Sequence, residues 1–137
     1  MKSQNSAAKS VKTKSKPAVK QNIAEAGLSL EPVFAALRKR YPAAAAQAQA
    51  VAFATAFYKR MEADEFTLHS ADDWAVLAAG MLEFARTRKP GKANVRVFNP
   101  ALKADGWESA HTVLQIVNDD MPFLVDTVTL ALAEQGI

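Results

Sequence analysis

The C-terminal segment, residues 112–137, constrains the fold more than any other part of this chain. Residues 112–117 are almost all β-branched or apolar, which predicts a strand covered on both faces. Asn118, Asp119 and Asp120 follow as turn formers. Beyond Phe123, apolar side chains recur with helical spacing, and Gly136 predicts the end of that helix. The segment therefore reads as a strand, a tight acidic loop and a helix.

A strand that feeds a helix needs a larger sheet on which the helix can lie. Pro122 is expected in the first turn of the helix, because its fixed φ suits that position and its missing N–H would be unpaired there. A sheet of two strands is marginal in water, and the chain stops at Ile137, where the next strand would begin. We therefore expect this chain to be the N-terminal piece of a longer protein.

The basic character of the chain is confined to its N-terminal end. The formal net charge is +3, but six of the 17 basic residues are lysines within the first 20 residues, where no acid occurs. The rest of the chain therefore carries about three net negative charges. Residues 1–22 are rich in Lys, Ser, Ala and Gln and predict a disordered tail. Because the tail has no aromatic residue and no Arg, we expect a solvated tail and not a nucleic-acid partner.

Composition also excludes several classes of protein. The chain has no Cys, which excludes disulfides and thiolate metal sites. It has no apolar run long enough for a transmembrane helix, and its N-terminus lacks the apolar region of a secretory signal. We therefore expect a cytoplasmic protein with no membrane partner.

Residues 23–92 predict a helical subdomain. The first helix is expected to be capped by Ser29 and to end at Tyr41, because a residue before proline is pushed out of the helical region. Pro42 then opens an Ala-rich second helix, and residues 62–69 form a polar connection. The apolar seams of the two helices are Leu30, Val33, Phe34, Leu37 and Tyr41 in the first, and Ala46, Ala50, Phe53, Phe57 and Met61 in the second.

The third helix has the clearest signals in the chain. Ser70 and Asp73 form a variant of the capping box, and Pro90 with Gly91 terminates the helix. Gly80 in the middle predicts close approach by a neighbouring segment. The apolar stripe of this helix consists of Trp74, Leu77, Ala78, Met81, Leu82 and Ala85.

A short strand is expected at Val95, Val97 and Phe98, ending at Asn99 and Pro100. The loop of residues 101–110 contains Trp107, which we expect to fold back on the body of the protein.

Asn118, Asp119 and Asp120 form the polar cluster with the most site-like character. Such a loop, between the end of a strand and the start of a helix, can receive a small ligand on its backbone N–H groups. The alternative is that Asp119 or Asp120 simply caps the helix, which explains an acid at this place by itself. His69 and His111 lack metal-ligand spacing, so we expect ordinary residues and no metal site.

No catalytic site is predicted within this chain. The sequence contains no glycine-rich phosphate loop of either common type, and no nucleophile–base pair can be named.

Several short motifs resemble the N-terminal region of the large bacterial NAD-specific glutamate dehydrogenases. The resemblance covers residues 28–137 and is densest from Arg88 onward. The motifs are RKPG at 88–91, VRVFNP at 95–100, DGW at 105–107, HTV at 111–113 and IVNDDMPFLVDTV at 116–128.

The resemblance implies a regulatory region ahead of a distant catalytic domain. In that family, a helical segment precedes the first of several ACT-type domains, which have βαββαβ topology. The parent reaction would be oxidative deamination of L-glutamate to 2-oxoglutarate and ammonium, with hydride transfer to NAD. The NAD and glutamate sites lie further along such chains, so no cofactor is expected in this one. Its expected partners are the rest of the parent enzyme, other subunits of a homo-oligomer and a small-molecule effector.

The resemblance also implies an effector loop. ACT domains carry a turn similar to Asp-x-Pro-Gly-Leu, and Asp120, Pro122 and Leu124 match it here, whereas Phe123 stands in place of the glycine. A Phe side chain would fill the space that glycine leaves for a ligand. The resemblance therefore supports the ACT-type fold for this chain more strongly than it supports amino-acid binding. The possible effector loop comprises Asn118, Asp119, Asp120, Met121, Pro122 and Phe123.

The expected fold class is α+β: a disordered tail at 1–22, a helical subdomain at 23–92, and at 93–137 the truncated start of an ACT-like, ferredoxin-like domain. The expected function is that of a noncatalytic regulatory or structural region of the parent enzyme. The alternative is a free-standing ACT-like module that binds a ligand or pairs its open sheet edge with another protein.

Overall fold

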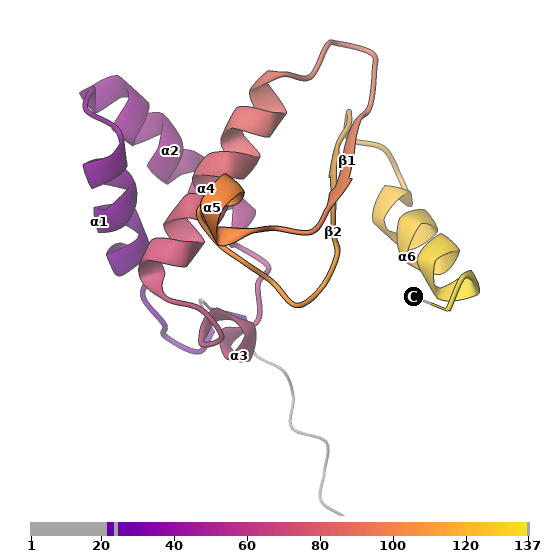
Figure 1. The fold of residues 1–137 in the computed structure, drawn as a ribbon, viewed down its shortest axis with the longest axis horizontal. Helices are drawn as coiled ribbons and strands as arrows, with labels where there is room; N and C mark the ends of the chain where they lie inside the picture. The colour runs from indigo at the N-terminus through magenta and orange to yellow at the C-terminus, as the bar shows by residue number, and fades with distance from the viewer. Residues whose placement is uncertain (1–21, 24, 137) are drawn as a thin grey trace, which may run out of the picture.

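The computed structural model describes residues 22–23 and 25–136, with a helical half followed by a small antiparallel sheet and a last helix (Figure 1). The expected disordered tail lies, apart from Asn22, outside the described residues. The elements are α1 (Glu31–Arg40), α2 (Ala44–Phe57), α3 (Ala63–Phe66), α4 (Ala71–Arg86), β1 (Asn94–Phe98), α5 (Leu102–Asp105), β2 (Val113–Val117) and α6 (Leu124–Glu134). In this described part, every helix is too short or too polar to cross a membrane.

The core of the protein lies among α1, α2 and α4. Val33 and Leu37 of α1 are fully buried there, as the apolar seam of the first predicted helix requires. The buried residues of α2 are Ala50 and Ala54, whose small side chains allow the neighbouring helices to approach closely. The largest fully buried side chains of the protein, Leu37 and Val33, both come from α1.

At the break between α1 and α2, the predicted stop of the first helix is confirmed, but Pro42 does not open the second helix, because α2 begins at Ala44 with Ala43 at its N-cap. Helix α1 ends at Arg40, and Tyr41 has extended backbone angles, as expected for a residue before proline. The start of α1 differs from the prediction by one residue. Leu30 holds the N-cap position, while the Ser29 hydroxyl accepts a hydrogen bond from the Glu31 N–H (3.1 Å).

Tyr58 and Trp74 join the end of α2 to the start of α4. The Tyr58 hydroxyl donates a hydrogen bond to the Trp74 carbonyl (2.7 Å), and the two rings meet edge to face. Burial raises the pKa of the Tyr58 hydroxyl, so this group remains a donor. The Trp74 indole N–H in turn donates to the Phe66 carbonyl of α3 (2.9 Å). This chain of contacts fixes the connection between α2 and α4.

The N-terminus of α4 confirms the predicted capping box. The Ser70 hydroxyl accepts a hydrogen bond from the Asp73 N–H (3.2 Å), and the Asp73 carboxylate accepts one from the Ser70 N–H (3.1 Å). The Ser70 hydroxyl also donates to that carboxylate (2.7 Å). These side-chain and backbone hydrogen bonds from Ser70 lower the pKa of Asp73.

The expectation of a close approach at Gly80 is wrong. A Cβ at Gly80 would have no neighbour within 4 Å. The close approach is instead at Gly106, where a Cβ would lie 3.0 Å from the Val76 Cγ1 atom and where φ is +77°. A side chain there would be strained at this φ, and its Cβ would make a tight contact with the Val76 side chain of α4.

Strands β1 and β2 pair antiparallel, and the sheet lies between α4 and α6 (Figure 1). In the register, Val95 stands opposite Ile116, and Val97 opposite Leu114. The other face turns toward α4, because the Arg96 guanidinium lies over the ring of Phe84 of α4. The predicted coverage of β2 on both faces is realised only in part: the face with Gln115 lies toward α4, whereas α6 lies over the other face only near Ile116, and most residues of β2 are half-buried.

Four further details differ from the prediction. Helix α2 ends at Phe57, so Met61 lies beyond its seam. The expected connection at 62–69 and the expected loop at 101–110 each contain one short helix, α3 and α5. Helix α6 begins at Leu124, so Pro122 lies ahead of the first turn and not within it.

In the loop 101–110, the Trp107 ring folds back as predicted and contacts the Phe98 ring, with 6.5 Å between the ring centroids.

We predict that Ser70→Ala lowers the free energy of unfolding by about 1 kcal/mol at neutral pH, because it removes the capping box. The lowered pKa of Asp73 gives this effect a definite pH dependence. The contribution of Asp73 is present above the pKa of the unfolded chain and is lost as the pH falls through the lower pKa of the folded state. Urea unfolding from pH 7 down to pH 2 measures the difference. Thr55→Ala, an exposed position in α2, is the control and should cause no loss. If the difference in unfolding free energy between the wild type and Ser70→Ala were as large at pH 2 as at pH 7, the contribution assigned to the Asp73 carboxylate would be wrong.

Candidate effector loop and neighbouring cavities

The candidate effector loop, residues 118–123, connects the end of β2 to the start of α6. Its backbone conformation is set at Phe123, which has φ of +61° and is the one non-glycine residue with positive φ in the described chain. This left-handed conformation costs an ordinary side chain roughly 1–2 kcal/mol, whereas glycine adopts it freely. The loop thus keeps a glycine-type backbone at the position where the resemblance expects glycine.

Asp119 is held by an ion pair outside its own loop. Its Oδ1 atom lies 2.6 Å from the Arg88 Nη2 atom, beyond the C-terminal end of α4. The Arg88 side chain is only 17% exposed, and its Nε–H donates to the Lys92 carbonyl (2.9 Å). The loop is therefore tied to the segment between α4 and β1.

The capping alternative for Asp119 and Asp120 is not realised. The N-cap position of α6 is held by Phe123, and no side chain there accepts a hydrogen bond from the first turn. Asp120 is exposed. The acids of this loop are thus not explained by helix capping.

The remaining loop residues leave an open, apolar surface. The Asn118 amide makes only a weak contact with the Met121 sulfur (3.4 Å). The Phe123 side chain is 76% exposed. Behind the loop, a cavity of about 190 Å³ separates β2 from α6, lined by Ile116, Leu124, Val125, Val128 and Thr129. This cavity accepts apolar groups but offers no charged partner.

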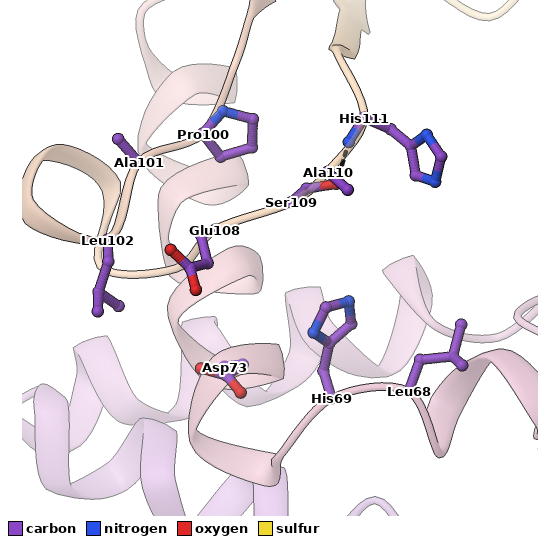
Figure 2. Close-up of a pocket in the computed structure, with 10 residues that line it drawn as sticks. All are labelled: Leu68, His69, Asp73, Pro100, Ala101, Leu102, Glu108, Ser109, Ala110 and His111. Carbon is purple, nitrogen blue, oxygen red and sulfur yellow. Dashed lines mark hydrogen bonds between the residues drawn. The ribbon is translucent and has the colours of Figure 1, made fainter.

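A larger cavity of about 900 Å³ lies elsewhere, between the start of α4 and the connection from β1 to β2 (Figure 2). It brings together two segments that are far apart in the sequence, one with His69 and Asp73 and the other with Glu108 and His111. The His69 ring meets the Trp74 ring edge to face, with 5.1 Å between centroids. Sequence spacing gave no signal for this cluster, because only the return of the 101–110 segment to α4 creates it.

The cluster does not form a metal centre. Within residues 22–23 and 25–136, no group of three or more His, Cys, Asp or Glu side chains is placed to hold a metal ion. The Asp73 carboxylate is engaged by Ser70. The cavity is lined by polar side chains and can hold a polar molecule. The Ser109 hydroxyl in its lining accepts a hydrogen bond from the His111 backbone N–H (3.0 Å), and among the described residues no hydrogen bond joins that hydroxyl to a His or carboxylate side chain.

Comparison with known proteins gives a clear family relationship. Residues 53–137 match the family model described as glutamate dehydrogenase, ACT1 domain. The chain is 33% identical over 85 residues to the NAD-specific glutamate dehydrogenase of Halomonas elongata, which covers 62% of this chain and 5% of that protein. It is 31% identical over 88 residues to the NAD-specific glutamate dehydrogenase of Pseudomonas aeruginosa, covering 64% of this chain and 5% of that protein. The chain thus matches only a small part of each relative. No solved structure matches it.

We predict that Phe123→Gly raises the free energy of unfolding by up to about 1 kcal/mol, because it relieves the left-handed strain while removing a side chain that buries little area. The matched control is Leu130→Gly, an exposed leucine within α6, which should instead lose about 1 kcal/mol. Chemical denaturation measures both variants. If both glycines destabilised the protein equally, the left-handed conformation of Phe123 would be wrong.

Proposed function

The chain belongs to the glutamate dehydrogenase ACT1-domain family, and we propose that it serves as a noncatalytic regulatory and structural region of a large NAD-dependent glutamate dehydrogenase. In this proposal the helical subdomain anchors the start of an ACT-type domain, and the loop 118–123 lies where an effector would be sensed. The rest of the parent enzyme is its principal partner.

The observation that carries the proposal is an apolar surface left uncovered by the described chain. Val95 and Val97 share a face with Leu114 and Ile116, since residues opposite each other in an antiparallel pair lie on the same side. Helix α6 covers that face only near Ile116, and Val97 remains 63% exposed. A surface of this kind normally packs against further protein.

Helix α6 adds to the same surface. None of its described residues is buried, and Val125 is 73% exposed. The main packing contacts of the protein join β1 with β2 and the helices α1, α2 and α4 with one another, so α6 has little support of its own. More chain or another subunit is needed to cover it.

The strand order indicates where further chain would pair. Strand β1 holds one edge of β2, so only the other edge of β2 is free. In a split βαβ arrangement, a strand that follows α6 would return parallel to β2 through a right-handed crossover, with one further strand between the two. That further strand, antiparallel to β2, would fit the free edge. This arrangement supports our proposal that β2 and α6 form the first βα unit of a βαββαβ domain.

The chemistry of the parent would take place outside this chain. The relatives are named NAD-specific glutamate dehydrogenases. For the parent we propose the reaction of L-glutamate with NAD and water to 2-oxoglutarate, ammonium and NADH. In this proposal, NAD and glutamate would be held by a separate catalytic domain. A homo-oligomer and an amino-acid-like effector are further parts of the proposal.

A free-standing interaction module is the second candidate function, favoured by the open strand edge and the exposed valines. The two functions differ in what covers the apolar surface. In the first it is the same polypeptide or its oligomer, and in the second it is an unrelated protein.

We predict that the purified 137-residue chain produces no NADH from glutamate and NAD, with the Pseudomonas aeruginosa enzyme as positive control. Absorbance at the NADH band measures turnover. Glutamate-dependent NADH from the pure chain would overturn the noncatalytic role.

The same preparation separates the two candidate functions. Sedimentation should show self-association that weakens about tenfold in the variant Val97→Ser with Val125→Ser, because both side chains lie on the uncovered surface. Leu68→Ser, an exposed leucine in the helical half, is the control and should leave association unchanged. A concentration-independent monomer would count against the first candidate function and leave the interaction module.

A further inference from the structure

A small basic cavity lies between the end of α4 and the start of β1. Its volume is about 220 Å³, and its lining residues are Thr87, Arg88, Lys89, Lys92, Ala93 and Asn94. Half of these side chains carry a positive charge, and none carries a negative one. Charges of one sign around a concave site raise the local concentration of ions of the opposite sign.

The obvious structural explanation is that these basic residues complement the dipole of α4. Other groups already complement the C-terminal end of α4. The Phe84 carbonyl, near the end of α4, accepts hydrogen bonds from the Asn94 amide (3.1 Å) and from the Thr87 hydroxyl (2.8 Å). Arg86, in the last turn, supplies a cation at the helix end and is paired with Glu83. The positive charges of Arg88, Lys89 and Lys92 are therefore not needed to complement the helix dipole.

Arg88 is held in a fixed orientation at the edge of this cavity. Its Nε–H donates to the Lys92 carbonyl, and its Nη2 atom contacts the Asp119 carboxylate of the effector loop. Lys89 and Lys92 form no ion pair with any described residue. A guanidinium and two free ammonium groups around a small cavity are the usual means of binding a carboxylate or phosphate.

We propose that this cavity binds a small anion that carries a carboxylate or phosphate group, and that Asp119 is its internal competitor for Arg88. In the described state, Asp119 is the ion-pair partner of Arg88 and ties the effector loop to the segment between α4 and β1, although the buried Arg88 Nη2 atom has no hydrogen bond. An anion bound by Lys89, Lys92 and Arg88 displaces that carboxylate and releases the loop. The binding site itself does not depend on the role proposed for the loop.

The proposal is tested by titrating the 137-residue chain with inorganic phosphate and, separately, with succinate. Sodium chloride keeps the ionic strength constant, and amide chemical shifts are followed by NMR. We expect saturable shifts at Lys89, Lys92 and Asp119, with a dissociation constant on the order of 1 mM. Tighter binding of phosphate identifies a phosphate ligand, and tighter binding of succinate a carboxylate ligand. Shifts that do not saturate with either probe would overturn the proposal.

Variants with opposite expected effects make the test specific. Asp119→Asn removes the competitor and should tighten anion binding about threefold to tenfold, whereas Lys92→Gln should weaken it by a similar factor. Lys103→Gln, an exposed lysine in α5, is the matched control and should change nothing. Unchanged or weaker binding by Asp119→Asn would overturn the competition between Asp119 and the anion.

Discussion

Helix α4 is the element on which the rest of the structure depends, because it is packed on two sides. Toward α1 and α2 it buries Trp74, Ala78 and Leu82. Toward the sheet it presents Phe84, which lies under the Arg96 guanidinium, and Val76, which lies against Gly106. The helical half and the sheet are therefore joined through this helix, and its capping box fixes where it begins.

The order of packing away from α4 explains which parts are well supported. Helices α1 and α2 share a closed core with α4. The sheet contacts α4 mainly at Phe84, through the Arg96 guanidinium and the Asn94 amide. Helix α6 is the next layer out and has no buried residue in the described chain. The Arg88–Asp119 ion pair is the polar contact that connects the loop before α6 back to the segment after α4. The candidate effector loop thus lies at the boundary between the supported and the uncovered part of the protein.

Local signals in the sequence predicted the helices and strands well. The seam of α1, the stop at Tyr41 and the capping box of Ser70 are each set by a few neighbouring residues, so propensity and periodicity reveal them. Long-range contacts were not visible in this way. The close approach was assigned to Gly80 and occurs at Gly106, because it depends on how the 101–110 segment returns to α4.

In the candidate site too, local features could be predicted from the sequence and long-range contacts could not. The loop position followed from the strand and helix around it, but its details did not. The Arg88–Asp119 pair joins residues separated by the whole sheet, and the cavity with His69 and His111 needs two distant segments. The left-handed angle of Phe123 was not predicted from local propensity either, since a Phe rarely adopts it. Tertiary constraints on the short turn override that preference.

Amide hydrogen exchange of the 137-residue chain tests most directly whether α6 lacks its natural covering. Amides of α4 should be protected to nearly the free energy of global unfolding, whereas amides of α6 should exchange through local opening at a much lower free energy. Equal protection of α4 and α6 would show that this chain already supports α6. The uncovered surface could then no longer be taken as the place where the rest of a larger enzyme packs.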